Sequence, residues 1–458
     1  MTALFARHAL LPEGWRRDVL LEWDLHGDLT RVAPGAEAPL NVAHADYVLP
    51  GMVNLHSHAF QRALGGLTER AGADDTGDSF WTWRDLMYRF AARITPAQIE
   101  AIAAQLFAEC LRHGYTAVCE FHYLQRDVDG SSYARPAETA ERVAAAAQAA
   151  GIGLTLLPVL YSHAGFGAQP LKPEQQRFRT DVDAVLGMVE ALDTLRGGQL
   201  EVGAAPHSLR AAGIDQIRAL IAALPPGRPL HIHIAEQQAE VEQSLSNVGR
   251  RPVEYLLEQV EVDARWCLVH ATHLSDAEVT ALARSGAVAG LCPTTEANLG
   301  DGLFPLAPFI AAGGRFGIGS DSHVSQSPVE ELRWLEYGQR LQHQRRNVSA
   351  TRNARNVGDY LWQGALQGGA QAAGRRVGAL DAGKRADLIV LDGQHPNLDG
   401  VQDDEVLGRL VFCGNDNLVR DVLCGGHWVV QGGRHMAQEA IAQRYRHAVR
   451  ELRELSQR

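Results

Sequence analysis

The chain has 458 residues, of which 46% are hydrophobic and 21% are charged, and its formal net charge at pH 7 is −11. This composition is typical of a globular protein large enough for one barrel and a smaller domain. The acidic balance and the lack of a basic run argue against nucleic acid as a partner, and no apolar run approaches the roughly 18 residues of a membrane span. We therefore expect a cytoplasmic protein with no membrane partner.

The first two parts of the chain differ in their pattern. Residues 1–47 hold short alternating strands such as DVLLEWD, and from residue 48 apolar β-rich runs alternate with segments of helical period. The eight candidate strands of this second part are YVLPGMVNLHSH, TAVCEFHY, GLTLLPVLYSH, LEVGAAPHS, PLHIHIAE, WCLVHATH, AVAGLCPT and RFGIGSDSH. Eight parallel βα units predict an α/β fold, a (β/α)8 TIM barrel over residues 48–373.

The remaining segments return to shorter elements. Residues 374–430 contain ADLIVLD and the start of DVLCGGHWVVQGG, punctuated by glycine and aspartate. Together with residues 1–47 they predict a small β-sandwich domain formed from both chain ends. Residues 431–458 combine helical period with charge pairs, which predicts a C-terminal helix.

Metal-binding residue types lie at the C-terminal ends of several candidate barrel strands, where this fold builds its active sites. His56 and His58 end the first strand, and because they are two residues apart their rings point to the same side. His233 ends the fifth strand, and Asp321 ends the eighth. One H-x-H pair is weak support, but several strand ends on one rim predict a metal site made of these four residues.

Neighbouring residues have other predicted roles. Glu236, three residues after His233, is a candidate proton shuttle, with a solvated loop carboxylate as the alternative. His270 ends the sixth strand near the same rim, while His231 lies one layer deeper and is assigned a structural role. The histidines beyond the strand ends, His273 and His323, are interpreted as supporting or exposed loop residues.

The lysine count separates two kinds of metal site. Binuclear barrels bridge their metals with a carbamylated lysine at a strand end, but Lys172 lies in a proline-rich loop and Lys384 in the C-terminal flank. We therefore predict one Zn²⁺ ion per subunit with an open position for water. Iron or manganese also suits imidazole and carboxylate ligands.

At these residues the sequence resembles the amidohydrolase superfamily, in the mononuclear branch with H-x-H, H-x-x-E, a strand-six histidine and a strand-eight aspartate. The resemblance covers nearly the whole chain, from PGMVNLHSHAF to GALDAGKRADLIVLD. The motifs LHSHAFQRA, FWTWRDLMY, EFHY, PHSLRA, HIHIAEQ and GSDSHVS resemble those of the formimidoylglutamate deiminases. This resemblance implies hydrolysis of N-formimino-L-glutamate to N-formyl-L-glutamate and ammonia, a step of histidine degradation, and superfamily relatives suggest a homodimer.

The resemblance also implies roles for individual residues. Glu236 is expected to protonate the imino nitrogen, His270 to orient or deprotonate the nucleophile, and Asp321 to pass a proton to the departing ammonia. Because the substrate is a dicarboxylate, its contacts are expected to include arginines. The implied substrate-binding residues are Gln61, Arg84, Tyr123, His207 and Arg210. For each arginine alone, a surface ion pair is the simpler alternative.

One departure and two other functions remain open from the sequence. Leu124, Gln125 and Arg126 stand where the family often has histidines after EFHY, and Arg126 near the barrel mouth is a candidate influence on anion preference. A deaminase of a purine, pterin or triazine ring is the second enzyme hypothesis, which the segment LCPTTEANLGDGLFP faintly favours. The third hypothesis is a catalytically inactive scaffold protein. The presence of all four predicted metal ligands, and of Glu236 and His270, disfavours it.

Overall fold

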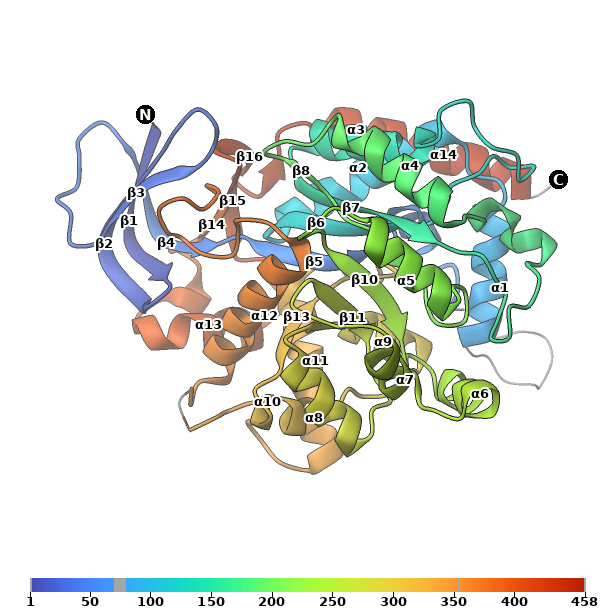
Figure 1. Ribbon diagram of the computed structural model, residues 1–458. Helices are drawn as coiled ribbons and strands as arrows, with labels where there is room; N and C mark the ends of the chain where they lie inside the picture. The colour runs from blue at the N-terminus through green and yellow to red at the C-terminus, as the bar shows by residue number, and fades with distance from the viewer. Residues whose placement is uncertain (1, 70–79, 353, 457–458) are drawn as a thin grey trace.

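A computed structural model describes residues 2–69, 80–352 and 354–456 (Figure 1). Within these residues, strands from the two ends of the chain join in one eight-stranded sheet of order β17-β16-β15-β14-β4-β1-β2-β3. Its strands are β1 (Thr2–Leu11), β2 (Gly14–Trp23), β3 (Leu29–Ala33), β4 (Ala43–Pro50), β14 (Leu388–Leu391), β15 (Val419–Cys424), β16 (His427–Gln431) and β17 (Arg434–His435). The N-terminal and C-terminal halves meet where β14 pairs antiparallel with β4. The expected strand-rich domain from both chain ends is therefore present.

A closed parallel barrel forms the larger part of the described chain. Its strands are β5 (Met52–Ser57), β6 (Tyr115–His122), β7 (Gly153–Leu160), β8 (Leu200–Val202), β9 (Ala205–Pro206), β10 (Leu230–Ile234), β11 (Trp266–His270), β12 (Val288–Leu291) and β13 (Arg315–Ile318). They form one sheet from β5 to β8, with β9 beside β7, and a second sheet from β10 to β13. Parallel bridges between Ser57 and Asp321 and between Ala204 and Leu230 close the circle. The predicted TIM barrel is confirmed.

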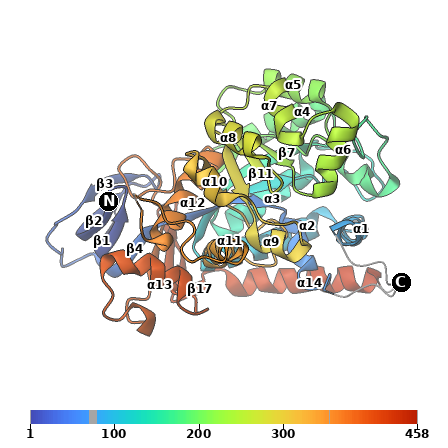
Figure 2. The same cartoon turned by 90° about the horizontal axis from the view of Figure 1, so that it is seen from below.

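Helices surround the barrel, and sequence signals account for several of their ends. They are α1 (Phe80–Ala91), α2 (Pro96–Arg112), α3 (Glu138–Ala150), α4 (Val182–Asp193), α5 (Ile214–Ala223), α6 (Gln238–Val248), α7 (Pro252–Gln259), α8 (Asp276–Ser285), α9 (Pro293–Leu299), α10 (Leu306–Ala311), α11 (Pro328–His343), α12 (Val357–Ala373), α13 (Val406–Phe412) and α14 (Gln438–Ser456). Thr95 and Gln98 form a capping box at the start of α2, and Gly151 ends α3 in the left-handed region with φ 78°. Figure 2 shows α14 running beside α2, where Gln98 Nε2 donates to Glu451 Oε2 at 3.1 Å.

The bottom of the barrel is sealed by the C-terminal end of α12. His231 Nε2 donates to the carbonyl oxygen of Ala372 at 2.9 Å, and Thr155 Oγ1 donates to that of Ala373 at 2.8 Å. Both donors are completely buried. These bonds satisfy carbonyl groups that the helix end leaves without an intrahelical partner. His231 thus has the structural environment expected for it.

The segment YVLPGMVNLHSH differs from the single strand expected of it. It divides at Gly51 into β4, which belongs to the outer sheet, and β5, which begins the barrel. A Cβ atom at residue 51 would overlap the side chain of Thr116 on β6, so only glycine lets the chain pass between the sheets here. The predicted domain boundary at residues 47 and 48 falls inside β4, and β17 precedes the final helix. The division into domains stays a prediction.

None of the described helices is long and apolar enough to cross a membrane. Their apolar residues instead form the core between barrel and helices, and a second, smaller cluster fills the outer sheet.

Replacing Gly368 by alanine tests how closely α12 packs on β13. A Cβ atom there would overlap the backbone carbonyl of Phe316, which cannot turn aside as a side chain can. We expect the free energy of unfolding to fall by about 3 kcal/mol, measured by urea denaturation. Gly187 on α4 is the matched control because a Cβ atom there meets nothing within 4 Å, so alanine is expected to be neutral or stabilising by up to about 1 kcal/mol. Equal stability of the two variants would contradict this packing.

Candidate active site

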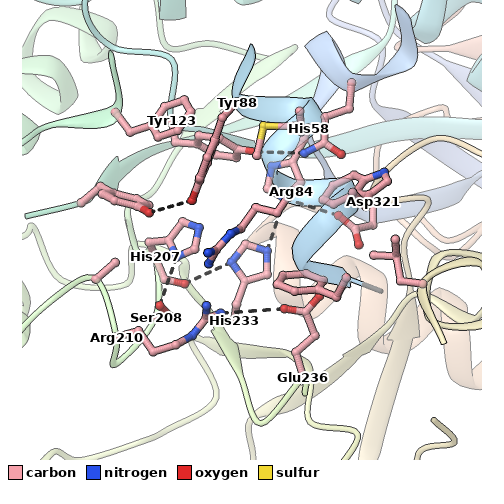
Figure 3. A pocket seen from close by; sticks show the side chains of 18 of the residues that line it. His58, Arg84, Tyr88, Tyr123, His207, Ser208, Arg210, His233, Glu236 and Asp321 are labelled. Carbon is pink, nitrogen blue, oxygen red and sulfur yellow. Dashed lines mark hydrogen bonds and ion pairs between the residues drawn. The ribbon is translucent and has the colours of Figure 1, made fainter. Parts of the chain in front are cut away.

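Three histidine rings and one carboxylate converge at the C-terminal rim of the barrel. Figure 3 shows three of these four side chains, His58, His233 and Asp321. His56 Nε2 lies 3.2 Å from His58 Nε2 and 2.9 Å from His233 Nε2, and the last two atoms are 3.3 Å apart. Asp321 Oδ1 lies 3.4 Å from Nε2 of both His56 and His58. All four side chains are buried, and their ligand atoms lie within 4.8 Å of one another. The structure therefore brings together the four residues that the sequence predicts as metal ligands.

Hydrogen bonds decide which nitrogen of two of these rings, His58 and His233, faces this point. His58 Nδ1 donates to the carbonyl oxygen of Phe121 at 2.9 Å, and His233 Nδ1 donates to that of His207 at 3.1 Å. Burial lowers the pKa of His58 and lowers that of His233 well below its ordinary value, so both rings are neutral at pH 7. Their Nε2 lone pairs must then point at the shared centre.

Lone pairs that face one another cannot satisfy each other by hydrogen bonding. A cation satisfies them, because each nitrogen then donates its electron pair. The carboxylate of Asp321 supplies negative charge at the same place, and hydrogen bonding and charge from His56 lower the pKa of Asp321 against the opposing effect of burial. Three imidazoles and one carboxylate thus fit a divalent transition metal ion.

A group of charged residues lies beside this cluster. His270 Nε2 is 3.7 Å from Glu236 Oε1 and 3.8 Å from Asp321 Oδ2, and His270 Nδ1 is 3.3 Å from Glu296 Oε1. Burial alone would lower the pKa of His270, but the surrounding carboxylates raise it to about 10. Burial raises the pKa of Glu236, although His270 and Arg210 oppose the shift. A buried carboxyl group with a raised pKa and a buried imidazole ring with a raised pKa therefore lie next to the candidate metal-ligand cluster.

The predicted substrate contacts line one pocket, with about 660 Å³ of space, that also exposes the cluster. They are Gln61, Arg84, Tyr123, His207 and Arg210. Figure 3 shows Arg84 and Arg210 entering this pocket from different elements, α1 and the turn after β9. Arg210 Nη2 lies 3.9 Å from Glu236 Oε2 and its Nε lies 3.8 Å from Glu240 Oε2, both longer than hydrogen bonds. This guanidinium can therefore still form direct hydrogen bonds with an anion.

Gln61 and Tyr123 form the wall nearest the histidines. Gln61 Nε2 donates to Tyr123 Oη at 2.8 Å, and the ring of Tyr123 meets that of His58 edge to face with centroids 4.8 Å apart. Both residues are buried. Tyr123 Oη therefore accepts the hydrogen bond from Gln61, and its own hydroxyl hydrogen is donated to Met87 Sδ at 3.9 Å.

Arg126 lies outside this pocket. Its guanidinium donates to the carbonyl oxygen of Arg179 and to Ser132 Oγ, each at 2.7 Å. The two residues before it, Leu124 and Gln125, are buried away from the pocket lining. The departure after the EFHY motif therefore does not alter the walls of the candidate site.

Several residues at the site were not singled out from the sequence. Glu296 lies inside α9, and Tyr88 comes from α1, so neither has the strand-end position that marks the others. Tyr161 does carry that signal, because it directly follows β7 in the VLYSH segment. His323, which the sequence predicts as a supporting or exposed loop residue, is buried, with Nε2 3.3 Å from Ser57 Oγ and Nδ1 2.9 Å from Ser320 Oγ.

Comparisons with known proteins identify families and a relative that this chain resembles. The profile described as "Amidohydrolase family" matches residues 47–429, and "Formimidoylglutamate deiminase HutF, N-terminal domain" matches residues 1–39. A formimidoylglutamate deiminase of Pseudomonas aeruginosa is 55% identical, covering 99% of this chain and 100% of its own length.

Solved structures show the same architecture. An amidohydrolase from Brucella melitensis superposes with a TM-score of 0.93 at 45% identity, over 99% of this chain and 100% of that one. An adenosine deaminase from Xanthomonas campestris with bound zinc shares the fold, with a TM-score of 0.80 at 23% identity over 99% and 98% of the two chains. The match to the amidohydrolase family over residues 47–429 and the full-length similarity at 55% identity show that this chain belongs to the amidohydrolase family.

Proposed function

We propose that this protein hydrolyses N-formimino-L-glutamate to N-formyl-L-glutamate and ammonia, a step of histidine degradation. The observation that carries the proposal is one pocket with a metal-ligand cluster and Glu236 at one end and two guanidinium groups, Arg84 and Arg210, within reach. The substrate has a matching shape, with an amidine at one end and two carboxylates at the other. The full-length similarity to a formimidoylglutamate deiminase supports the same reaction.

The amidohydrolase family is metal-dependent, and we propose one zinc ion held by His56, His58, His233 and Asp321. The directed lone pairs described above support this ligand set. When bound, a divalent metal lowers the pKa of a water molecule and so provides a nucleophile near neutral pH. Iron and manganese are the other candidates for this donor set.

Glu236, His270 and Asp321 handle the protons. Glu236 is buried, and its raised pKa suits a group that delivers a proton to the imino nitrogen as that nitrogen becomes basic. His270 keeps its own proton among three carboxylates and therefore orients the nucleophile as a donor. Asp321 accepts the proton from the nucleophile and passes it to the departing ammonia. The second proton of the water nucleophile returns to Glu236, and the C=N bond is thereby replaced by the C=O bond of the formyl product.

The remaining pocket residues bind the substrate. Arg84 and Arg210 neutralise its carboxylates, and bidentate hydrogen bonds from a guanidinium give them one orientation. His207 lies beside His233, with ring centroids 4.9 Å apart. Gln61 and Tyr123 bind the part of the substrate that lies beside His58. Fixing both ends of a flexible substrate places the formimino carbon at the cluster.

Ammonia release from N-formimino-L-glutamate, before and after removal and restoration of zinc, tests the proposal. We expect activity that disappears with a chelator and returns with metal. Guanine is assayed in parallel as the substrate of a ring deaminase. Inactivity of the metal-loaded protein toward formiminoglutamate would remove the substrate assignment, and release of ammonia from guanine would favour the ring deaminase instead.

The homodimer and the cytoplasmic location remain predictions of the sequence. Light scattering of the purified protein at several concentrations tests the first.

A further inference from the structure

A second cluster of hydroxyl and amide groups forms the wall of the pocket farther from the histidines. It consists of Tyr88 on α1, Tyr161 directly after β7, and Gln175 in the 3₁₀ turn η2 (Pro173–Phe178). Both tyrosines line the pocket, and all three side chains are at most 5% exposed. The mechanism above assigns none of them a role.

The orientation of the Gln175 amide is fixed by the backbone. Its Oε1 accepts a hydrogen bond from Lys172 N at 3.0 Å, a bond that only the oxygen end of the amide can accept. The nitrogen end must then face the tyrosines. Gln175 Nε2 lies 2.8 Å from Tyr161 Oη and 3.3 Å from Tyr88 Oη, so its two hydrogens are donated to the two phenol oxygens.

Counting hydrogens shows what this leaves for a ligand. Each tyrosine has one hydroxyl hydrogen, and both oxygens already accept from Gln175. The two hydroxyls are 3.4 Å apart, so they can share one weak hydrogen bond between them. At least one phenolic hydrogen therefore has no acceptor among the hydrogen bonds found within residues 2–69, 80–352 and 354–456, and it lies at the pocket wall.

Cationic groups surround these hydroxyls and define the ligand they suit. Arg84 Cζ lies 5.4 Å from the centroid of the Tyr88 ring, and both Arg84 and Arg210 act electrostatically on Tyr161. Hydroxyl donors beside guanidinium groups match a carboxylate, which only accepts hydrogen bonds. A carboxylate offers two charged acceptor oxygens to these donors, whereas a carboxamide offers one neutral oxygen and an NH2 group that cannot accept.

Ring contacts order the two hydroxyl clusters by their distance from the metal ligands. Tyr123 contacts the ligand His58 directly, whereas Tyr161 contacts His207 at 4.7 Å, and His207 in turn contacts His233. In formiminoglutamate the α-carboxylate is attached to the carbon that bears the retained nitrogen of the formimino group, and the side-chain carboxylate is two methylenes farther away. The outer cluster therefore corresponds to the side-chain carboxylate.

Building on the proposed function, we propose that Gln175 is a positioning residue that sets substrate specificity. Its amide nitrogen donates to the hydroxyl oxygens of Tyr88 and Tyr161. A hydroxyl hydrogen of the tyrosines is therefore left to be donated to the side-chain carboxylate of the substrate. Gln175 does not touch the substrate itself. Its contribution is to make the outer wall a donor surface, which favours a dicarboxylate over its side-chain amide.

Gln175→Glu reverses the polarity of this cluster. A glutamate keeps an oxygen for Lys172 N, but its second oxygen accepts the phenolic hydrogens and turns them away from the pocket. We expect KM for N-formimino-L-glutamate to rise about 10-fold to 100-fold with kcat within about threefold, since hydrogen bonds to a charged group are lost. For N-formimino-L-glutamine, whose side chain ends in an amide, KM is expected to change by less than about threefold.

Two further variants separate specificity from folding. Gln175→Leu removes the donors without reversing them, and we expect a smaller rise in KM, about fivefold. Gln98→Leu is the matched control, because Gln98 Oε1 likewise accepts from a backbone amide, Thr95 N at 3.0 Å, and its Nε2 donates to Glu451 far from the pocket. Thermal denaturation of both variants reports the structural loss, and only Gln175→Leu is expected to change KM.

Binding of the product keeps this test independent of turnover. Calorimetry with N-formyl-L-glutamate and N-formyl-L-glutamine gives dissociation constants for wild-type protein and Gln175→Glu. A selectivity for the dicarboxylate that falls at least tenfold in the variant supports the proposal. Equal losses for both ligands, or an unchanged selectivity, would overturn it. Lack of turnover by wild-type protein would instead count against the proposed function alone.

Discussion

Replacing Glu236 by glutamine is expected to lower kcat for N-formimino-L-glutamate by about 10³-fold while the metal content stays the same. General acid–base catalysis contributes about 10²-fold to 10⁴-fold, and a glutamine amide cannot deliver the proton that the imino nitrogen needs. Glutamine has nearly the size of glutamate, so the side chain at residue 236 still packs beside His270 and Arg210 but no longer carries a negative charge. Steady-state ammonia release and metal analysis of the same preparation measure the two quantities.

An exposed glutamate on the following helix provides the control for this substitution. Glu242 lies on α6, where its Oε1 accepts from Gln238 at 3.5 Å, and Glu242→Gln is expected to retain wild-type kcat. Full activity of Glu236→Gln would exclude Glu236 as the proton donor. Loss of metal together with activity would show that Glu236 acts on the ligand cluster rather than on the substrate.

The metal-ligand cluster was predictable because its members lie at strand ends. Parallel strands that close into a barrel bring their C-terminal ends to one rim, so residues far apart in sequence, such as His58 and Asp321, meet there. Tyr123 and His207, which the family resemblance implies as substrate contacts, line the pocket beside this cluster. Here the order of the strands supplies the three-dimensional proximity.

The outer wall of the pocket could not be predicted in this way. Gln175 and Tyr88 lie in connections between strands, and the path of such a connection depends on tertiary packing rather than on a local pattern. Gln175 meets Tyr88 only because η2 and α1 cover the same side of the barrel mouth. No sequence pattern predicts the contact between Gln175 and Tyr88.

The backbone at the rim is a second feature without a sequence signal. His270, Ala271 and Asp321 have φ values of 67°, 47° and 44°, in the left-handed region that non-glycine residues rarely adopt. Each such residue costs about 1–3 kcal/mol unless the surrounding structure compensates. The packed barrel around these residues thus holds their backbone in a conformation that they rarely adopt otherwise.

Replacing Arg210 by methionine is expected to lower kcat/KM for N-formimino-L-glutamate by about 10²-fold to 10³-fold, mainly through KM. Removing one partner of a buried charge pair costs about 2–5 kcal/mol, because the remaining charge is left without compensation. Arg210 is 11% exposed, and Glu236 and Glu240 lie beside it, so the pocket would become an anionic site that repels the dicarboxylate. Initial rates over a range of substrate concentrations separate the effects on KM and kcat.

Two other arginine variants distinguish substrate binding from support of the fold. Arg210→Lys keeps the charge but loses the planar fork, so we expect it to recover about tenfold of the lost kcat/KM. Arg218 on α5 is the control, since its 47% exposed side chain pairs with Asp215 at the surface and such pairs contribute about 1 kcal/mol or less. A similar loss of kcat/KM in Arg218→Met would assign the effect to general destabilisation.

A ligand whose side-chain carboxylate is replaced by an amide shows which of the two carboxylates Arg210 binds. If Arg210 binds the α-carboxylate, Arg210→Met weakens N-formyl-L-glutamate and N-formyl-L-glutamine by the same factor, because both keep that group. If Arg210 binds the side-chain carboxylate, only the affinity for the dicarboxylate falls. For Gln175→Glu we expect that only the affinity for the dicarboxylate falls. The same selective loss in Arg210→Met would place Arg210 with Tyr88 and Tyr161 at the outer wall. An equal loss for both ligands in Arg210→Met would place Arg210 at the α-carboxylate.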